Sequence, residues 1–134
     1  MIPEFSFAVL GSGSRGNCSV IRNGSHLCLV DSGLSLKQTR LRMETLGLQM
    51  EDVSDIFLTH LDRDHLNTSW AGQVKRQRIR VHVGPSHLNA AAEAGIPEWC
   101  LHAVASEMSM VHDGLAVQRI DVAHDDAGCS SFIF

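Results

Sequence analysis

The segment His60-Leu61-Asp62-Arg63-Asp64-His65 contains four side chains that can bind a metal ion, and it follows the apolar run Ile56-Phe57-Leu58. Alternate residues of an extended chain share one side, so His60 and Asp62 would lie together, and a turn after Arg63 would bring Asp64 and His65 around. Imidazole and carboxylate donors suit zinc, manganese or iron. The segment contains no cysteine, whose thiolate is a common ligand in closed structural zinc sites. The alternative is a solvated polar loop that contains two histidines by chance. The spacing favours a metal-binding loop at the end of a buried strand.

The rest of the chain alternates short strands and helices, which indicates the α/β class. Asn23-Gly24 is a strong two-residue turn signal and predicts a hairpin, and Asp113-Gly114 predicts a turn in a terminal β-meander. We expect strands over 5–10, 19–22, 27–30, 55–59, 79–83, 108–112, 115–122 and 130–134. We expect helices over 34–48 with Ser35 as cap, from Asn67 or Thr68 to Lys75, and over 85–94 closed by Gly95. This order fits half of an αββα sandwich with the metal loop at the sheet edge.

Length and composition set the outer limits of the interpretation. The 134 residues, 44% of them hydrophobic, are enough for one folded domain with a real core. No stretch approaches the roughly 20 apolar residues of a membrane span, and the start Met1-Ile2-Pro3-Glu4 lacks the basic residues of a secretory signal. We therefore expect a cytoplasmic protein without a membrane partner. The four cysteines are far apart, with no Cys-x-x-Cys pair, and are expected to be buried free thiols: Cys18, Cys28, Cys100 and Cys129.

A second motif competes with the metal loop. Gly11, Gly13 and Gly16 satisfy Gly-x-Gly-x-x-Gly after an expected strand, and Asp31 stands twenty positions after the first glycine, as in a dinucleotide-binding fingerprint. That fold needs a helix directly after the glycines to face the pyrophosphate. Residues 16–30 are poor helix formers with a turn signal in the middle. We therefore expect a tight loop near the metals instead.

Several segments together resemble the metallo-β-lactamase superfamily. Its usual signature after such a strand is His-x-His-x-Asp-His, and here Asp62 stands in place of the middle histidine. The segments 10–19 (LGSGSRGNCS) and 29–33 (LVDSG) are similar to the opening of the YycJ-type hydrolases, a branch similar to DNA exonucleases and to the ribonuclease-J and β-CASP nucleases. Val122-Ala123-His124-Asp125-Asp126-Ala127 resembles the third histidine segment. The resemblance implies a metallo-β-lactamase-like αββα sandwich.

The resemblance also implies a ligand set. His60, Asp62 and His124 would hold a first metal ion, with a position left for water, and Asp64 and His65 would hold a second. Asp31 could orient a ligand histidine from behind, with Asn17 also in support. The bridging aspartate and last histidine of the family would lie beyond residue 134. We therefore expect residues 1–134 to be the N-terminal part of a longer domain, with a complete first site and an incomplete second site.

The metal could be zinc, manganese or iron. Zinc is the first expectation, and the Asp62 carboxylate raises the relative preference for manganese or iron. A carboxylate at this position also resembles the flavodiiron branch, whose motif is His-x-Glu-x-Asp-His. Alternatively, the substitution marks a site that has lost its metal.

These features predict a metal-dependent hydrolase, a phosphodiesterase or nuclease in which metal-activated water attacks phosphorus and Asp64 orients that water. DNA or RNA would be the substrate. The alternatives are a small-molecule ester or lactam hydrolase, a di-iron redox protein on the same fold, and a non-catalytic remnant. The net charge of -4 argues against a general nucleic-acid binder. Lys75, Arg76, Arg78 and Arg80 form a basic patch that could contact phosphates, or could be a solvated helix end.

Overall fold

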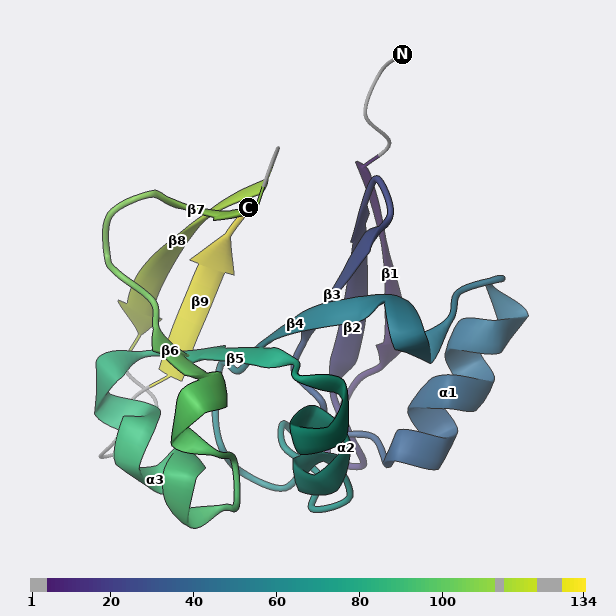
Figure 1. Cartoon of the computed structure of the whole chain (residues 1–134), viewed down its shortest axis with the longest axis horizontal. Helices are drawn as coiled ribbons and strands as arrows, with labels where there is room; N and C mark the ends of the chain where they lie inside the picture. The colour runs from purple at the N-terminus through teal and green to yellow at the C-terminus, as the bar shows by residue number, and fades with distance from the viewer. Residues whose placement is uncertain (1–4, 113–114, 123–128) are drawn as a thin grey trace.

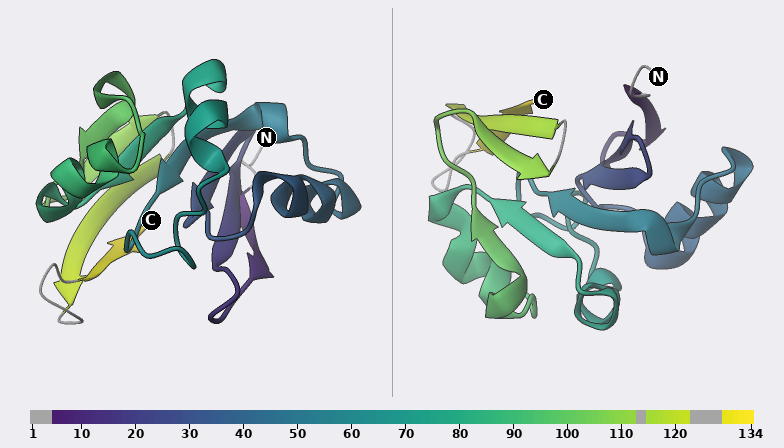
Figure 2. Two further views of the ribbon diagram at one scale, coloured as in Figure 1. Left: turned by 90° about the horizontal axis from the view of Figure 1, so that it is seen from below. Right: turned by 45° about the horizontal axis from the view of Figure 1, so that its top comes forward.

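The computed structural model describes residues 5–112, 115–122 and 129–134. Its strands are β1 (Phe5–Gly11), β2 (Cys18–Asn23), β3 (His26–Val30), β4 (Val53–Phe57), β5 (Arg80–Val83), β6 (Leu101–Ala103), β7 (Ser109–His112), β8 (Leu115–Val122) and β9 (Cys129–Ile133). Its helices are α1 (Leu36–Thr45), α2 (Trp70–Gln77) and α3 (Leu88–Glu93), with short 3₁₀ turns η1 (Met50–Asp52), η2 (Pro85–His87) and η3 (Glu98–Cys100). Three layers result, because the helices cover one face of a six-stranded sheet and β7–β9 lie on its other side (Figures 1 and 2).

The six-stranded sheet has the order β1-β2-β3-β4-β5-β6. β1, β2 and β3 pair antiparallel, while β3, β4, β5 and β6 run parallel to one another. β7, β8 and β9 form a separate antiparallel meander. Parallel strands bring their carboxyl ends to one edge of the sheet, where α/β proteins bind ligands. The residues after β3 and β4 therefore meet at this edge.

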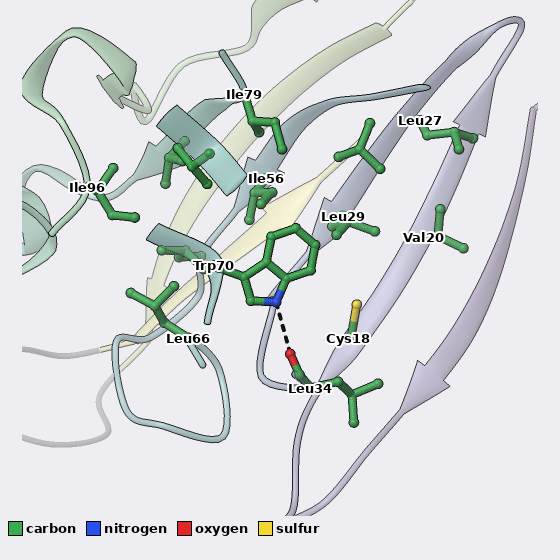
Figure 3. Close-up of a cluster of buried hydrophobic side chains, with 14 of the residues drawn as sticks. Cys18, Val20, Leu27, Leu29, Leu34, Ile56, Leu66, Trp70, Ile79 and Ile96 are labelled. Atoms are coloured by element: carbon green, nitrogen blue, oxygen red, sulfur yellow. Dashed lines mark hydrogen bonds between the residues drawn. The ribbon is translucent and has the colours of Figure 1, made fainter. Parts of the chain in front are cut away.

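The helices pack on the sheet through a core centred on Trp70 of α2. Trp70 is fully buried, and its indole N–H donates a 2.9 Å hydrogen bond to the Leu34 carbonyl oxygen (Figure 3). Met43 of α1, Ala91 of α3 and Ile56 of β4 belong to the same buried cluster. Because Leu34 follows β3 and Trp70 follows the metal loop, this bond ties together the two connections that carry the candidate site.

A second core fills the space between the two sheets. Phe57 of β4 is fully buried, with Leu115 and Val117 of β8 in the same cluster. Its ring stacks on the His82 ring at 4.4 Å and meets Phe132 edge to face at 5.5 Å between centroids. β4 is thus buried on both faces, which explains its short apolar run.

A buried ionic group lies beside Phe57. The fully buried Asp55 carboxylate accepts hydrogen bonds from His82 Nε2 at 2.7 Å and Ser54 Oγ at 2.6 Å. Arg80 donates through Nε at 2.9 Å and through an Nη at 3.0 Å. Burial by itself raises the pKa of the Asp55 carboxyl, but the hydrogen bonds from His82 and Ser54 and the charges of His82 and Arg80 lower that pKa below its ordinary value. Asp55 is therefore a charged, structural residue.

The predicted elements are largely confirmed, with local differences. The hairpin pairs Asn23 with His26, so its turn lies one residue later than predicted. β4 begins and ends two residues before the predicted strand 55–59, and the short strand β6 was missed. The cap of α2 was also wrong: Ser69 is the cap residue, while Asn67 Oδ1 accepts from the Ser69 N–H at 3.0 Å. Ser35 caps α1 as predicted, accepting from the Gln38 N–H at 3.1 Å.

All four cysteines are free, three of them buried and Cys129 half-buried, as predicted. Burial raises the pKa of Cys18 to about 12, with the nearby Asp31 charge adding to it, so this thiol is unreactive at neutral pH. In the described parts of the chain, no helix has the length and apolar character to cross a membrane. The predicted turn at Asp113-Gly114 lies outside the described residues.

The first prediction concerns Asp55. Asp55→Ala should lower the free energy of unfolding by about 3–5 kcal/mol at pH 7, because Arg80 and His82 lose a buried partner. The pKa of Asp55 is lowered on folding, so its contribution is present above its unfolded pKa of about 4 and is lost as the pH falls through the folded pKa. Urea unfolding between pH 3 and 7 measures this. The exposed Asp52→Ala is the control, and equal losses in both variants would contradict the assignment.

Candidate metal centre

The candidate site lies at the sheet edge where the parallel strands β3 and β4 end. Asp31 follows β3 and Thr59 lies two residues after β4. The Asp31 N–H donates to the Phe57 carbonyl oxygen at 2.7 Å, and the Thr59 N–H donates to Asp31 Oδ1 at 2.8 Å. Asp31 has φ 65°, a left-handed conformation that aspartate tolerates better than most residues. The turn at the end of β3 therefore directs the Asp31 carboxylate toward the loop after β4.

Asp31 joins that loop to His65. Its Oδ2 accepts from Thr59 Oγ1 at 2.8 Å and from His65 Nδ1 at 2.8 Å, and Thr59 Oγ1 lies 3.2 Å from His65 Nδ1. The carboxylate assigns the ring proton to Nδ1 and leaves the Nε2 lone pair for a ligand, the usual arrangement behind a metal-binding histidine. Asp31 thus contacts His65, and its role in supporting a metal ligand stays a prediction.

The same contact changes the acidity of His65. The hydrogen bond to Asp31 raises the pKa of the imidazole above its ordinary value. Burial opposes this effect, and the charges of Asp31, Asp64 and Asp62 add to it. In the metal-free chain a proton therefore competes with a metal ion for His65.

Two donor pairs result from the fold of residues 60–65, which form the loop after β4 and are called the histidine loop. His60 Nδ1 lies 3.7 Å from Asp62 Oδ2, and His65 Nε2 lies 3.6 Å from Asp64 Oδ2. The rings of His60 and His65 are nearly perpendicular, with centroids 4.7 Å apart, so the two pairs are neighbours. His60 is buried, whereas the Asp62 side chain is 68% exposed. The family resemblance implies the same two pairs for two metal ions, and this division stays a prediction.

The distances within each pair fit a shared metal ion. Two ligands at 2.0–2.2 Å from a tetrahedral zinc ion lie about 3.4 Å apart. The nitrogen-oxygen separations in both pairs are close to that value. Within the described residues, no three histidine, cysteine or acidic side chains converge on one point, so each pair needs a further ligand. His124, the predicted third ligand of the first pair, lies outside the described residues.

The histidine loop is held from the other side by residues 11–17, the glycine loop, which ends at Asn17. The Asn17 side-chain amide donates to the Asp64 carbonyl oxygen at 3.0 Å and lies 3.4 Å from Asp64 Oδ2. The Ser32 N–H donates to the His65 carbonyl oxygen at 2.7 Å. Backbones are so close here that a Cβ on Gly33 would lie 1.8 Å from the Asp64 carbonyl oxygen. Three loops that are distant in sequence are therefore interlocked at Asp64.

The dinucleotide-binding alternative does not fit this arrangement. The glycines are followed directly by β2, whereas the fingerprint needs a helix at this place in the chain. Gly16 has φ 147°, and a Cβ there would lie 2.8 Å from the Gly33 carbonyl oxygen. The glycines thus allow close packing of loops around Asn17.

The predicted nucleic-acid contacts are not brought to the site. Lys75 and Arg76 lie in the last turn of α2 and Arg78 follows it, whereas the histidine loop precedes the start of that helix. Because α2 has eight residues, its first and last turns lie at opposite ends of a helix about 12 Å long. Arg78 lies over the Trp99 ring at 5.7 Å, and Arg80 is bound to Asp55. A role of Lys75, Arg76 and Arg78 in phosphate binding stays a prediction.

Thr59 is a residue of the site that the sequence reasoning missed. Its hydroxyl and its N–H both donate to Asp31, and it directly precedes His60. Its place between the apolar strand and the first histidine was a signal that could have identified it. The Thr59 hydroxyl and His65 Nδ1 thus both contact the same Asp31 oxygen, Oδ2.

Comparison with known proteins gives a consistent result. The family model described as the metallo-beta-lactamase superfamily matches residues 11–99. The exodeoxyribonuclease YycJ of Bacillus anthracis is 42% identical over 60 residues, which cover 45% of this chain and 23% of that protein. The exodeoxyribonuclease WalJ of Streptococcus pneumoniae serotype 2 is 33% identical over 63 residues, covering 47% of this chain and 23% of that protein.

Solved structures agree on the fold. A β-lactamase from Chitinophaga pinensis superposes with a TM-score of 0.78 at 14% identity over 96% of this chain and 53% of that chain. The Rm3 metallo-β-lactamase superposes with a TM-score of 0.74 at 18% identity, over 94% and 52%. The chemotaxis sensor ODP, solved as a peroxy diiron species, gives 0.69 at 11%, over 96% and 54%. This chain thus spans about half the length of these structures. Because the matched residues 11–99 include both the glycine loop and the histidine loop, the chain belongs to the metallo-β-lactamase superfamily.

Proposed function

We propose that this protein is a metal-dependent hydrolase that acts on phosphodiester bonds of DNA or RNA. The observation that supports it most is the arrangement in which Asp31 holds His65 Nδ1 at 2.8 Å while Nε2 faces Asp64 Oδ2 at 3.6 Å. This geometry suits a ligand pair that is oriented before the metal binds. The local similarity to two exodeoxyribonucleases supports the choice of substrate.

The ligands would be divided between two ions. His60 and Asp62 would hold the first ion together with His124, and Asp64 and His65 would hold the second. Ser130, six residues after His124, donates its N–H to the Thr59 carbonyl oxygen at 2.9 Å, directly before His60. This contact brings the start of β9 next to the residue that precedes His60. Zinc is proposed first, with manganese or iron as alternatives because of the Asp62 carboxylate.

The chemistry divides between the ions and the side chains. Bound divalent ions lower the pKa of water and stabilise negative charge on the attacked group. The Asp64 carboxylate, 32% exposed, can orient a water molecule and accept a hydrogen bond from it. Asp31 would keep the His65 ring in place through its hydrogen bond with Nδ1. Asp64 would therefore be the catalytic residue.

A di-iron redox protein is the second candidate. It is favoured by the carboxylate at position 62 and by the fold shared with the diiron form of the chemotaxis sensor. A small ester or lactam hydrolase and a non-catalytic remnant remain the further alternatives. A single domain over residues 1–134 and a cytoplasmic location stay predictions.

Metal content tests the ligand assignment directly. The chain purified without chelator should contain at least one ion, as measured by elemental analysis. His60→Ala and His124→Ala should each cost the purified chain its first, tightly bound ion, because each removes one of the three protein ligands of that ion. His26→Ala, at an exposed histidine of β3, is the matched control. A parent chain without metal, or full metal content in both ligand variants, would rule out the first site.

The role of Asp31 can be tested without a metal. Asp31→Asn keeps a side chain that tolerates the left-handed backbone but removes the negative charge, so the pKa of His65 should fall. In the parent, folding raises the pKa of His65. The Asp31–His65 pair therefore stabilises the fold fully below the unfolded histidine pKa of about 6.5, and this contribution is lost as the pH rises through the folded pKa. NMR titration of the ring and urea unfolding from pH 5 to 9 measure both effects. An unchanged pKa would contradict the assignment.

The activity prediction concerns Asp64. With manganese, the parent should degrade DNA or RNA, and Asp64→Ala should reduce the rate by about 100-fold or more, as loss of a positioned acid-base group does. Asp52→Ala should retain the parent rate. Cleavage that persists in Asp64→Ala would remove Asp64 from the mechanism, and optical bands of bound iron without cleavage would favour the redox alternative.

A further inference from the structure

Asn17 makes an unusually complete set of contacts for a loop residue. Its side-chain oxygen accepts from the Gly13 N–H at 3.1 Å, and its amide nitrogen donates to the Gly13 carbonyl oxygen at 3.0 Å. The same nitrogen reaches the Asp64 carbonyl oxygen at 3.0 Å and Asp64 Oδ2 at 3.4 Å. Asn17 therefore connects the glycine loop with both the backbone and the side chain of Asp64.

The backbone of Asn17 adds two further bonds. Its N–H donates to the Asp64 carbonyl oxygen at 2.7 Å, and its carbonyl oxygen accepts from the Gly33 N–H at 2.9 Å. The Asp64 carbonyl oxygen thus receives two donors from a single residue. Because the backbone bonds do not depend on the side chain, replacement of Asn17 leaves the loop anchored and removes only the amide.

We propose that Asn17 is the positioning residue that holds the Asp64 carboxylate beside His65, and thereby sets the affinity of the Asp64–His65 pair for a metal ion. The inference rests on the proposed function, because it assigns a role to Asn17 within the proposed second ion site. Asp64 lies next to His65 and can rotate about its side-chain bonds. The amide selects the rotamer in which Oδ2 is 3.6 Å from His65 Nε2.

The chemistry of the amide explains why asparagine suits this position. The position needs an acceptor for Gly13 and a donor for Asp64, and the carboxamide of asparagine supplies both from one short, planar, uncharged group. Because the Asn17 amide is a neutral donor, it orients the Asp64 carboxylate without neutralising the negative charge that attracts a metal ion. Loss of such a partner behind a ligand typically weakens metal binding by about 10- to 100-fold.

Metal titration gives the first test. The metal-free chain is titrated with Mn²⁺ by calorimetry, for the parent, Asn17→Ala, Asp64→Ala and the double variant. Asn17→Ala should raise the Kd of the weaker ion by about 10- to 100-fold and leave the tighter ion within about twofold. In the Asp64→Ala background the Asn17 change should have no further effect, because it acts through Asp64.

Asn67→Ala is the matched control. Asn67 is also a loop asparagine, but its side chain accepts from Ser69 and not from Asp64. Its replacement should leave both Mn²⁺ affinities unchanged. Equal weakening of both ions by Asn17→Ala, or the same losses in Asn67→Ala, would show a general loosening of the loops and overturn the proposal.

A second measurement is independent of metal. Three-bond NMR couplings of Asp64 in the metal-free chain should report one side-chain rotamer in the parent and rotamer averaging in Asn17→Ala. A single, unchanged rotamer in the variant would overturn the proposal. If the parent binds no second Mn²⁺ ion, the two-ion form of the proposed function fails, while the couplings still decide whether Asn17 positions Asp64.

Discussion

The structure depends most on the Asp31 carboxylate at the end of β3. Its two oxygens accept hydrogen bonds from the Thr59 N–H, the Thr59 hydroxyl and His65 Nδ1. The parallel pairing of β3 with β4 makes these contacts possible, because both strands end at the same edge. One carboxylate thus sets the direction in which the chain leaves β4, the tautomer of His65 and the position of the histidine loop. The donor pairs follow from this geometry.

The site is held by backbone contacts as much as by side chains. Ser32 binds the His65 carbonyl oxygen, and Asn17 binds that of Asp64. Behind these contacts, the Trp70 indole N–H donates a hydrogen bond to the Leu34 carbonyl oxygen in the core between the helices and the sheet. The loops are therefore fixed to the rigid part of the fold on both sides. This is what a metal site needs, since ligands that are already in place lose little entropy when the ion binds.

Local patterns allowed most of the strands and helices to be predicted, because turn and cap residues such as Gly24, Ser35 and Gly95 act within a few positions of the chain. The ligand cluster was recognisable for the same reason, since its members are contiguous. Thr59 and the contacts of Asn17 were less accessible, because they arise from strand pairing and from the approach of Gly33 to Asp64. β6 was missed because its three residues carry no periodicity. The distance of Lys75 from the histidine loop likewise depends on the direction of α2.

The left-handed backbone of Asp31 has a consequence for sequence variation at this position. A non-glycine residue with φ 65° carries backbone strain on the order of 1 kcal/mol, and selection for folding alone would accept asparagine or glycine there. Asparagine would preserve the turn and an acceptor for Thr59, yet would place a neutral group behind His65. A library screened for expression or solubility would therefore enrich variants that keep the shape of the loop and lose its electrostatic support. At position 31, selection for the fold and selection for a metal site therefore favour different residues.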